Sequence, residues 1–262
     1  MMPVDATKTQ AAKSTQGQNA NLKWSRYAPF YDEMCTFIPA YQENIDTLLE
    51  VLPSLNLPEQ PKILDLGAGT GNYIVAVSEA LPGASFTHLD VDPVMNDAAR
   101  DKYTELDIDA VVVQKYIQRA DFAPSSFDLI ICVNALCHAA PQVPVLRRIS
   151  TWLKPKGKMF VIDFGRPVRI FDWLWYVFQN AVRNVGVVPF VKALVRNRQT
   201  VFQNRRAKKD QKQGSMWLHT PEEFRDTLER GAFDLIESRT CYRGYCDMAI
   251  CQPHQSDNPS TN

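Results

Sequence analysis

The sequence has no net charge, because 29 lysine and arginine residues are balanced by 29 aspartate and glutamate residues. This balance argues against a protein that binds nucleic acid through bulk positive charge. No uninterrupted apolar run reaches the roughly 20 residues that a membrane-spanning helix needs. With 11 glycines and 17 prolines, the chain is also too poor in both for a fibrous or low-complexity protein. An apolar fraction of 45% instead predicts a sizeable globular core.

The six cysteines contain no Cys-x-x-Cys pair. Cys241, Cys246 and Cys251 are evenly spaced by an odd number of residues, which on one strand would place neighbours on opposite faces. We therefore predict no metal site, and reduced, mostly buried thiols of a cytoplasmic protein.

Both ends of the chain are polar. Residues 1–21 are rich in Gln, Ala, Thr, Ser and Asn and lack the apolar core of a secretory signal. We expect disordered tails at 1–21 and 253–262, and a single folded domain over residues 22–252.

Short apolar runs alternate with helical patterns from residue 62 onward, which predicts an α/β fold around a parallel sheet covered on both faces. The expected strands are 62–66, 85–89, 110–113, 127–133, 158–164, 233–239 and 247–252. The expected helices are 41–57, 71–81, 93–104 and 142–153, followed by one beginning after Thr220, whose spacing to Glu223 is that of a capping box. Residues 154–157 read as a turn.

A basic insert interrupts this pattern at residues 166–215. Residues 166–213 contain eleven basic and two acidic side chains, a local charge of +9. Apolar residues at helical spacing predict an amphipathic helix from Ile170 to Val185, ending at Gly186.

The segment that indicates chemistry is residues 63–73, with the sequence ILDLGAGTGNY. A strand ends at Asp65 and Leu66, three alternating glycines follow, and a helix begins. Glycines allow a sharp turn and close approach of a ligand, and a helix N-terminus offers free amides. Asp90 ends the next strand, 19 residues after Gly71, where a carboxylate can accept both hydroxyls of a ribose.

The spacing of the loop glycines, and then a resemblance to a known family, indicate which ligand the loop binds. A dinucleotide fold normally has a third glycine at position 72, where this chain has Asn72. The Gly-x-Gly-x-Gly loop preceded by Asp65 instead resembles that of the class I S-adenosylmethionine-dependent methyltransferases. The small-molecule subgroup that includes quinone-biosynthesis enzymes is similar in several further segments, namely HLDVDPVM (88–95), FDLIICVNALCH (127–138), KPKGKMFVI (154–162), residues 222–233 and RYAPFYDEM (26–34).

The resemblance implies a Rossmann-like, doubly wound, mostly parallel seven-stranded sheet with a helical insertion after strand five. It also implies S-adenosyl-L-methionine as the cofactor. The acidic residue of strand one and the glycine loop would hold the amino acid end of the cofactor, and Asp90 would hold its ribose. Further contacts would come from the residues after Asp90, from the loop after strand four and from the N-terminal segment. The implied cofactor-binding residues are Asp65, Gly67, Ala68, Gly69, Gly71, Asp90, Val91, Met95, Asn134 and Tyr31.

At one position the sequence departs from the family pattern. An acidic residue often follows strand three and contacts the adenine amino group, but here that position falls at Tyr116 and Ile117. Either Tyr116 packs on the adenine, or a shortened loop brings Asp121 to it.

The predicted reaction is methyl transfer by in-line displacement to a small, apolar or amphiphilic acceptor. His138, in the loop after strand four, is the first candidate for a general base, and Asp163, ending strand five, is the second. His138 could equally be satisfied by local backbone. The rival functions are a nicotinamide-dependent oxidoreductase and a non-catalytic cofactor-binding regulator or scaffold.

Three interpretations of the insert remain open: a lid over the acceptor pocket, an element that contacts a membrane surface through residues 166–213, or a solvated helical decoration. The first two both favour an apolar or amphiphilic, lipid-like acceptor. Nucleic acid is disfavoured, because the Asn/Asp-Pro-Pro-Tyr/Phe motif of many nucleic-acid methyltransferases is replaced by residues 134–137. The sequence predicts no oligomeric state.

Overall fold

The computed structural model describes residues 31–32, 35, 38–184, 186, 192 and 216–254. The predicted tail at 1–21, nearly all of that at 253–262, and most of the insert after residue 184 lie outside the described residues.

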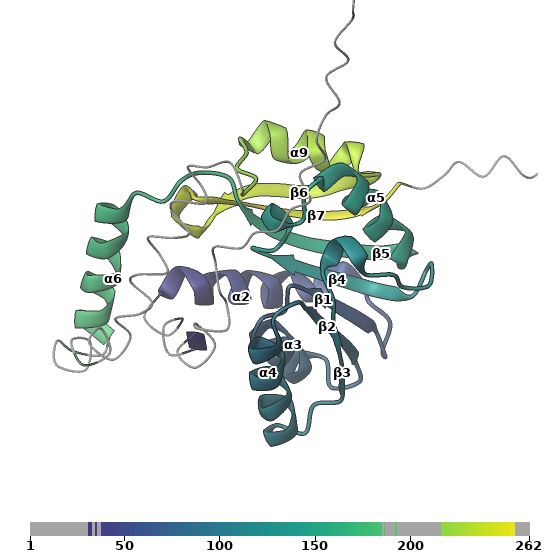
Figure 1. Ribbon diagram of the computed structural model, residues 1–262, viewed down its shortest axis with the longest axis horizontal. Helices are drawn as coiled ribbons and strands as arrows, with labels where there is room; N and C mark the ends of the chain where they lie inside the picture. Colours follow the sequence, from purple (N-terminus) through teal and green to yellow (C-terminus); the bar gives the residue numbers. More distant parts are fainter. Residues whose placement is uncertain are drawn as a thin grey trace, which may run out of the picture.

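A seven-stranded sheet forms the centre of the described structure (Figure 1). Its strand order is β3-β2-β1-β4-β5-β7-β6, with β7 antiparallel to both neighbours and the other pairs parallel. This confirms the predicted Rossmann-like α/β fold. The strands are β1 (Lys62–Leu66), β2 (Ser85–Asp90), β3 (Ala110–Gln114), β4 (Phe127–Val133), β5 (Leu153–Phe164), β6 (Phe233–Cys241) and β7 (Cys246–Pro253).

Helices cover both faces of the sheet (Figure 1). One apolar core lies between the sheet and helices α5 (Gln142–Trp152) and α9 (Pro221–Arg230). The other lies between the sheet and α2 (Pro39–Val51), α3 (Asn72–Ala80) and α4 (Pro93–Glu105). The central strand β4 is buried on both faces, which explains its uninterrupted apolar sequence. At the start of α9, Thr220 and Glu223 form the predicted capping box.

One local expectation was wrong. Strand β5 begins at Leu153, so residues 154–157 belong to the strand, where a register shift against β4 accommodates them. Cys241 and Cys246 do not share a strand, because the chain reverses between them through the short turn η5 (Tyr242–Gly244) and places them opposite each other. Among the described residues no cluster of His, Cys, Asp or Glu could hold a metal ion.

The insert begins with the predicted amphipathic helix, α6 (Ile170–Asn184). Gly186 follows it with φ 91°, a conformation that favours glycine after a helix. In Figure 1 this helix stands at one end of the molecule, away from the sheet. No helix in the described part of the chain is long and apolar enough to cross a membrane.

Candidate functional site

The site lies at the carboxyl edge of the sheet, between β1 and β4. The strand order reverses at this point, and loops leaving the two strands diverge to opposite faces, where doubly wound folds place their ligands. The loops touch at the base of the crevice: a Cβ on Gly67 would lie 2.4 Å from the Cβ of Ala135. A residue without a side chain is therefore required at position 67.

The glycine loop connects β1 to α3. Gly67, Gly69 and Gly71 all have positive φ, at 72°, 57° and 81°. A Cβ on Gly71 would clash with the hydroxyl of Tyr103 at 2.2 Å, whereas a Cβ on Gly69 would meet no heavy atom within 4 Å. The loop is thus packed at both ends and open in the middle. Ala68 is nearly buried between these glycines, and its amide donates to the carbonyl of Leu89 at 3.1 Å.

Asp90 ends β2 beside the open middle of the loop. Its Oδ2 accepts a hydrogen bond from the amide of Gly69 at 2.9 Å, and its Oδ1 accepts one from the amide of Asp92 at 2.8 Å. Burial raises the pKa of this carboxyl group, and the two amides partly offset that effect. The predicted pair of glycine loop and strand-two carboxylate is therefore in direct contact.

Asp65 lies beneath the loop and is almost fully buried. Its Oδ2 has no hydrogen-bond partner among the described residues. Burial, together with the charge of Asp90, raises the pKa of Asp65 to about 8. A buried carboxylate oxygen without a partner is costly, so this atom is suited to receive a cationic or hydrogen-donating ligand group.

Two other predicted cofactor residues follow Asp90. Val91 is half-buried, and Met95 is 3% exposed in the first turn of α4. Asp92 caps α4 by accepting from the amides of Val94 and Met95. This capping accounts for the second carboxylate of the Asp-x-Asp sequence.

The N-terminal segment reaches the glycine loop through Asp32, a contact that the sequence did not reveal. Asp32 Oδ1 accepts hydrogen bonds from Thr70 Oγ1 at 2.6 Å and Asn72 Nδ2 at 2.9 Å, and Oδ2 lies 2.8 Å from Lys102 Nζ. The neighbouring Tyr31 packs edge-on against Tyr41, with ring centroids 6.1 Å apart. The segment that carries Tyr31 is thus joined to the loop, α3 and α4.

The residues after β3 include Tyr116 and Asp121, the two alternatives for the residue that contacts the adenine. The backbone amide of Lys115 donates a hydrogen bond to the carbonyl of Asp90 at 3.2 Å. The adjacent Tyr116 therefore leaves the sheet beside Asp90, the residue predicted to bind the ribose. The Tyr116 ring is 52% exposed, with the guanidinium of Arg119 above it at 5.6 Å. Ile117 is buried in the core, whereas Asp121 is exposed and lies beyond the short turn η3 (Ile117–Arg119). This order favours Tyr116 over Asp121.

The loop after β4 carries Asn134 and His138. Asn134 has φ 54°, and its amide donates to the carbonyl of Ile162 at 2.8 Å. His138 is half-buried at the end of the turn η4 (Leu136–His138), and its carbonyl accepts from Gln118 Nε2 at 2.9 Å. The loops after β3 and β4 are therefore bonded to each other around the predicted base.

Asp163 is enclosed rather than open to an acceptor. It is fully buried, and its two oxygens accept the amides of Cys137, at 2.6 Å, and Phe164, at 2.8 Å. Burial raises the pKa of Asp163 to about 6. Because it touches the residue next to His138 and has no exposed surface, its position fits a role in holding the His138 turn, in place of the predicted role as a base.

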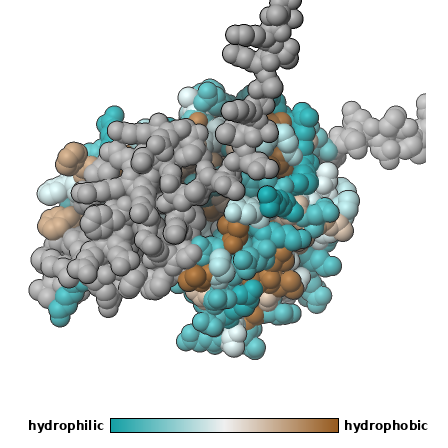
Figure 2. Space-filling view, viewed as in Figure 1, coloured by the Kyte–Doolittle hydropathy of each residue, from teal (hydrophilic) through white to brown (hydrophobic). Residues whose placement is uncertain are grey.

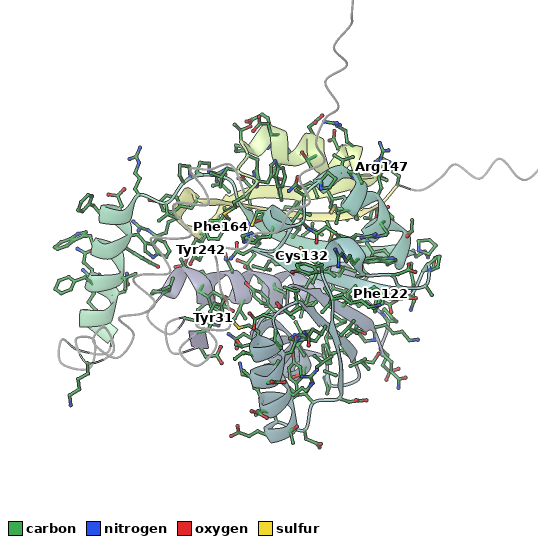
Figure 3. All side chains as sticks on the ribbon, viewed as in Figure 1. Tyr31, Phe122, Cys132, Arg147, Phe164 and Tyr242 are labelled. Atoms are coloured by element: carbon green, nitrogen blue, oxygen red, sulfur yellow. The ribbon has the colours of Figure 1, made fainter. Side chains whose placement is uncertain are left out.

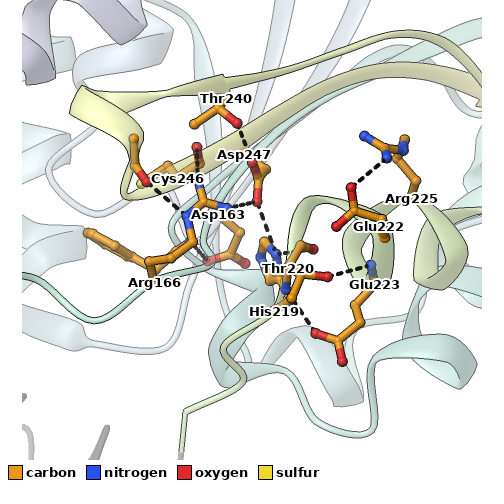
Figure 4. A network of polar contacts seen from close by, with 12 residues as sticks. Asp163, Arg166, His219, Thr220, Glu222, Glu223, Arg225, Thr240, Cys246 and Asp247 are labelled. Carbon is orange, nitrogen blue, oxygen red and sulfur yellow. Dashed lines mark hydrogen bonds and ion pairs between the residues drawn. The ribbon is translucent and has the colours of Figure 1, made fainter.

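A buried polar network continues from Asp163 across the sheet (Figure 4). Asp247 lies opposite Asp163 in the β5–β7 ladder and pairs with Arg166, His219 and Thr240. The backbone ties the same region together, because the amide of Trp217 donates to the carbonyl of Cys137 at 3.0 Å. Trp217, which follows the insert, is therefore bonded to the turn that carries His138.

Aromatic side chains gather next to this network. Phe164 and Tyr242 lie together at the end of β5 (Figure 3), with ring centroids 5.8 Å apart. Trp173 of α6 stacks on Tyr242 at 5.1 Å, and Tyr176 lies 5.5 Å from Trp173. We call these four residues the aromatic cluster. Burial raises the pKa of Tyr242, so its hydroxyl stays protonated and is suited to donate a hydrogen bond.

Residues 63–157 match the profile of the methyltransferase domain family. Over these residues the chain carries a methyltransferase domain. The matched residues include β1, the glycine loop, Asp90 and the His138 turn. The methyltransferase domain thus contains every element of the site described above except the segments around residues 31–32 and 163–247.

Two curated relatives are similar over this domain. A demethylmenaquinone methyltransferase of Listeria monocytogenes serotype 4a is 24% identical over 155 residues, which cover 58% of this chain. The chain spans 65% of the length of that relative. The highly reducing polyketide synthase cm3B of Cordyceps militaris is 31% identical over 135 residues, covering 45% of this chain and 5% of the synthase.

Solved structures share the fold of the methyltransferase domain. The methyltransferase in a complex with the Trm112 activator of Haloferax volcanii aligns with a TM-score of 0.61 at 15% identity, covering 89% of this chain and 99% of that one. An S-adenosylmethionine-dependent methyltransferase of Clostridium acetobutylicum aligns with a TM-score of 0.60 at 13% identity, covering 87% of this chain and 99% of that one.

The geometry of the methyltransferase domain fits S-adenosyl-L-methionine. The cofactor has a cationic amino group, a ribose with two hydroxyls and an adenine ring. Asp65 offers an unpartnered buried oxygen, Gly69 faces open space, and Asp90 ends the strand beside it. Asp65 thus suits the amino group of the cofactor, the space at Gly69 leaves room for it, and Asp90 suits the ribose hydroxyls.

Proposed function

We propose that this protein transfers the methyl group of S-adenosyl-L-methionine to a small, apolar or amphiphilic acceptor. The observation that carries the proposal is the glycine loop, which is packed at Gly67 and Gly71 but open at Gly69, directly beside Asp90. A loop packed along its whole length would leave no room for a nucleoside.

The aromatic cluster supports an apolar acceptor. It lies at the end of β5, where Phe164 follows the residue that is bonded to the β4 loop carrying His138. Aromatic rings offer large apolar surfaces to a ligand, and tyrosine hydroxyls offer hydrogen bonds. A relative whose name gives demethylmenaquinone as its substrate makes a quinol bearing a ring position open to methylation the first acceptor to test.

In methyl transfer, the main task of the protein is to position the acceptor against the cofactor. The sulfonium of the cofactor supplies an activated methyl group, and the sulfur keeps the bonding electron pair when that group leaves. The residues here would hold the acceptor in line, about 3 to 3.5 Å from the methyl carbon, and exclude water. If the acceptor must lose a proton, we propose His138 as the base that receives it, in a turn bonded to Asp163 and Gln118.

Calorimetry tests the cofactor. S-adenosylhomocysteine should bind the full chain, and NAD(H) should not. Asp90→Ala should weaken the binding at least tenfold, because the ribose hydroxyls lose their acceptor. Asp97→Ala, which removes an exposed carboxylate of α4 paired with Arg100, is the matched control and should bind normally. Binding of NAD(H) alone, or unchanged affinity in Asp90→Ala, would contradict the assignment.

Transfer of a labelled methyl group tests the activity. Labelled cofactor is incubated with the protein and either a demethylated prenyl quinol or a lipid extract of cells, and the products are separated by polarity. Label in an apolar product supports the proposal. Cofactor binding with no labelled product in either mixture would instead favour the regulator or scaffold, and label in water-soluble products only would refute the apolar acceptor.

A further inference from the structure

One face of α6 packs on the protein. Tyr176 accepts a hydrogen bond from the amide of Ala40 through its hydroxyl oxygen at 2.9 Å, and the guanidinium of Arg243 lies 4.1 Å from its ring centre. Trp173 stacks on Tyr242, and Val177 packs against the core between the sheet and helices α2, α3 and α4. These contacts determine the orientation of α6, so that the opposite face of the helix points to solvent.

The outward face carries large aromatic rings. Phe171 is 88% exposed and Trp175 is 61% exposed. Trp175 stacks on Phe178, which is also exposed, with the centroids 5.9 Å apart and the rings tilted by 27°. Positions 171, 175 and 178 follow the spacing of one helix face, so the three residues form a single stripe. We call them the outer stripe.

The outer stripe has no counterpart elsewhere on the described surface. The other exposed large apolar residues lie singly on separate elements, such as Val111 on β3 and Ile236 on β6. In Figure 2, pale brown atoms lie at the edge of the molecule where Figure 1 places α6. Concentrated exposed apolar surface of this kind is typical of an interaction site.

Positive charge flanks the stripe. Arg169 precedes α6 and Arg183 lies in its last turn, and both side chains are exposed. By sequence, the segment from 166 to 213 has a net charge of +9 within a chain of zero net charge. The partner should therefore combine an apolar layer with negative charge.

We infer that the outer stripe of α6 docks this protein on an anionic lipid surface, with Phe171 and Trp175 entering the boundary between headgroups and acyl chains. Helices that lie in this boundary have aromatic residues on one face and arginine or lysine near the phosphates. The inference does not depend on the proposed methyl transfer, because it rests on α6 alone.

The size and charge of the stripe favour a lipid surface over a protein. Three rings exposed to these fractions present roughly 400 Å², whereas a stable protein interface buries about 800 Å² on each partner. A second copy of this chain would also bring Arg169 and Arg183 of the two copies together, and like charges repel across an interface. A bilayer accepts a single narrow stripe without a complementary shape.

Flotation with vesicles tests the inference on the full chain. Vesicles of phosphatidylcholine alone are compared with vesicles that also contain phosphatidylglycerol. We expect binding to the mixed vesicles that weakens as salt is added, with little binding to phosphatidylcholine alone. The double variant F171S/W175S should reduce binding to the mixed vesicles at least tenfold, because the inserted rings are lost.

One further variant and one further measurement complete the test. V111S/I236S removes the two isolated exposed residues from the sheet and should bind vesicles as the unchanged protein does. Binding of S-adenosylhomocysteine, measured in parallel, reports that F171S/W175S is folded. Equal flotation of F171S/W175S and the unchanged protein, or no flotation with either vesicle, would overturn the inference. So would concentration-dependent dimerisation that F171S/W175S abolishes, which would assign the stripe to a second copy.

Discussion

The backbone amide of Cys137 donates a 2.6 Å hydrogen bond to Oδ2 of the fully buried Asp163. Oδ1 of the same carboxylate accepts the amide of Phe164. One side chain thus joins the end of β5 to the turn that carries His138. This places Asp163 behind the site, where it can affect the reaction only through the position of its neighbour.

Asp163→Asn should therefore slow methyl transfer without weakening cofactor binding. An asparagine can accept with only one of its two terminal atoms, so one of the two backbone amides loses its partner. A displacement of the His138 turn by about 1 Å is expected to lower kcat by about 10- to 100-fold. Affinity for S-adenosylhomocysteine, measured by calorimetry, should stay within about twofold, because the glycine loop and Asp90 are untouched.

Asp234→Asn serves as the control, because Asp234 is an exposed carboxylate on β6 and should leave both quantities unchanged. A parallel loss of cofactor affinity and kcat in Asp163→Asn would show a general structural role. An unchanged kcat would show that the turn does not depend on this carboxylate.

The raised pKa of Asp65 predicts a pH dependence of cofactor binding. In the cofactor-free protein this pKa is about 8, because burial and Asp90 disfavour the carboxylate. A cationic ligand group beside Oδ2 favours the carboxylate, so binding should release a proton. Affinity for S-adenosylhomocysteine should then rise between about pH 6 and pH 8, by up to tenfold per pH unit. Asp65→Asn should bind more weakly and lack this rise.

The same group predicts how stability changes with pH. The folded pKa of Asp65 lies above its unfolded value of 3.8, so the folded state retains the proton more tightly. The stabilising contribution of this protonation is complete below about pH 4 and is lost as the pH rises toward 8. Denaturant titrations of the cofactor-free protein should show this fall, and Asp65→Asn should reduce it. An equal fall in both proteins would contradict the shift.

Gly69 and Gly71 should respond differently to replacement by alanine. Gly69→Ala meets no neighbour, so its cost to stability is the positive φ, about 1 to 2 kcal/mol. Its methyl group projects into the predicted cofactor position and should lower affinity at least tenfold. Gly71→Ala drives a Cβ into the Tyr103 ring and should cost a further 1 to 3 kcal/mol by overpacking. Thermal unfolding and calorimetry on both variants separate the two effects, and equal affinity in Gly69→Ala and the unchanged protein would rule out a ligand there.

The central strands and the glycine loop were predictable because local sequence determines them. An apolar run such as 127–133 can only be buried, and alternating glycines between a strand and a helix are typical of a loop that lets a ligand approach its backbone. The burial of Asp163 was not predictable, since it depends on β7 and on Trp217 and His219, which lie far along the chain. The start of β5 was missed because Pro155 and Gly157 are typical of a turn, yet a register shift against β4 accommodates them within the strand. The domain limits of 22–252 stay a prediction.

Tyr116→Ala and Asp121→Asn distinguish the two alternatives for the adenine. Tyr116 follows the residue that is bonded to Asp90, and its half-exposed ring is available for stacking, so its loss should lower cofactor affinity by about 5- to 100-fold. Asp121 is exposed beyond η3, and Asp121→Asn should have no effect. Calorimetry on both variants decides between them. Weaker binding in Asp121→Asn alone would show that the loop rearranges to bring this carboxylate to the adenine.

Asp32 gives the last prediction, because it connects the N-terminal segment to the glycine loop. Its carboxylate is bonded to Thr70, Asn72 and Lys102. Burial acts to raise the pKa of Asp32, but the lysine and both hydrogen bonds outweigh it and lower that pKa. Asp32→Asn keeps the size of the side chain but removes the charge that Lys102 faces. The pair is partly exposed, so global stability should fall by less than about 1 kcal/mol. The local effect should be larger: amides of residues 69–72 should exchange hydrogen faster, and cofactor affinity should fall. An unchanged exchange rate at the loop would show that Asp32 follows the loop without holding it.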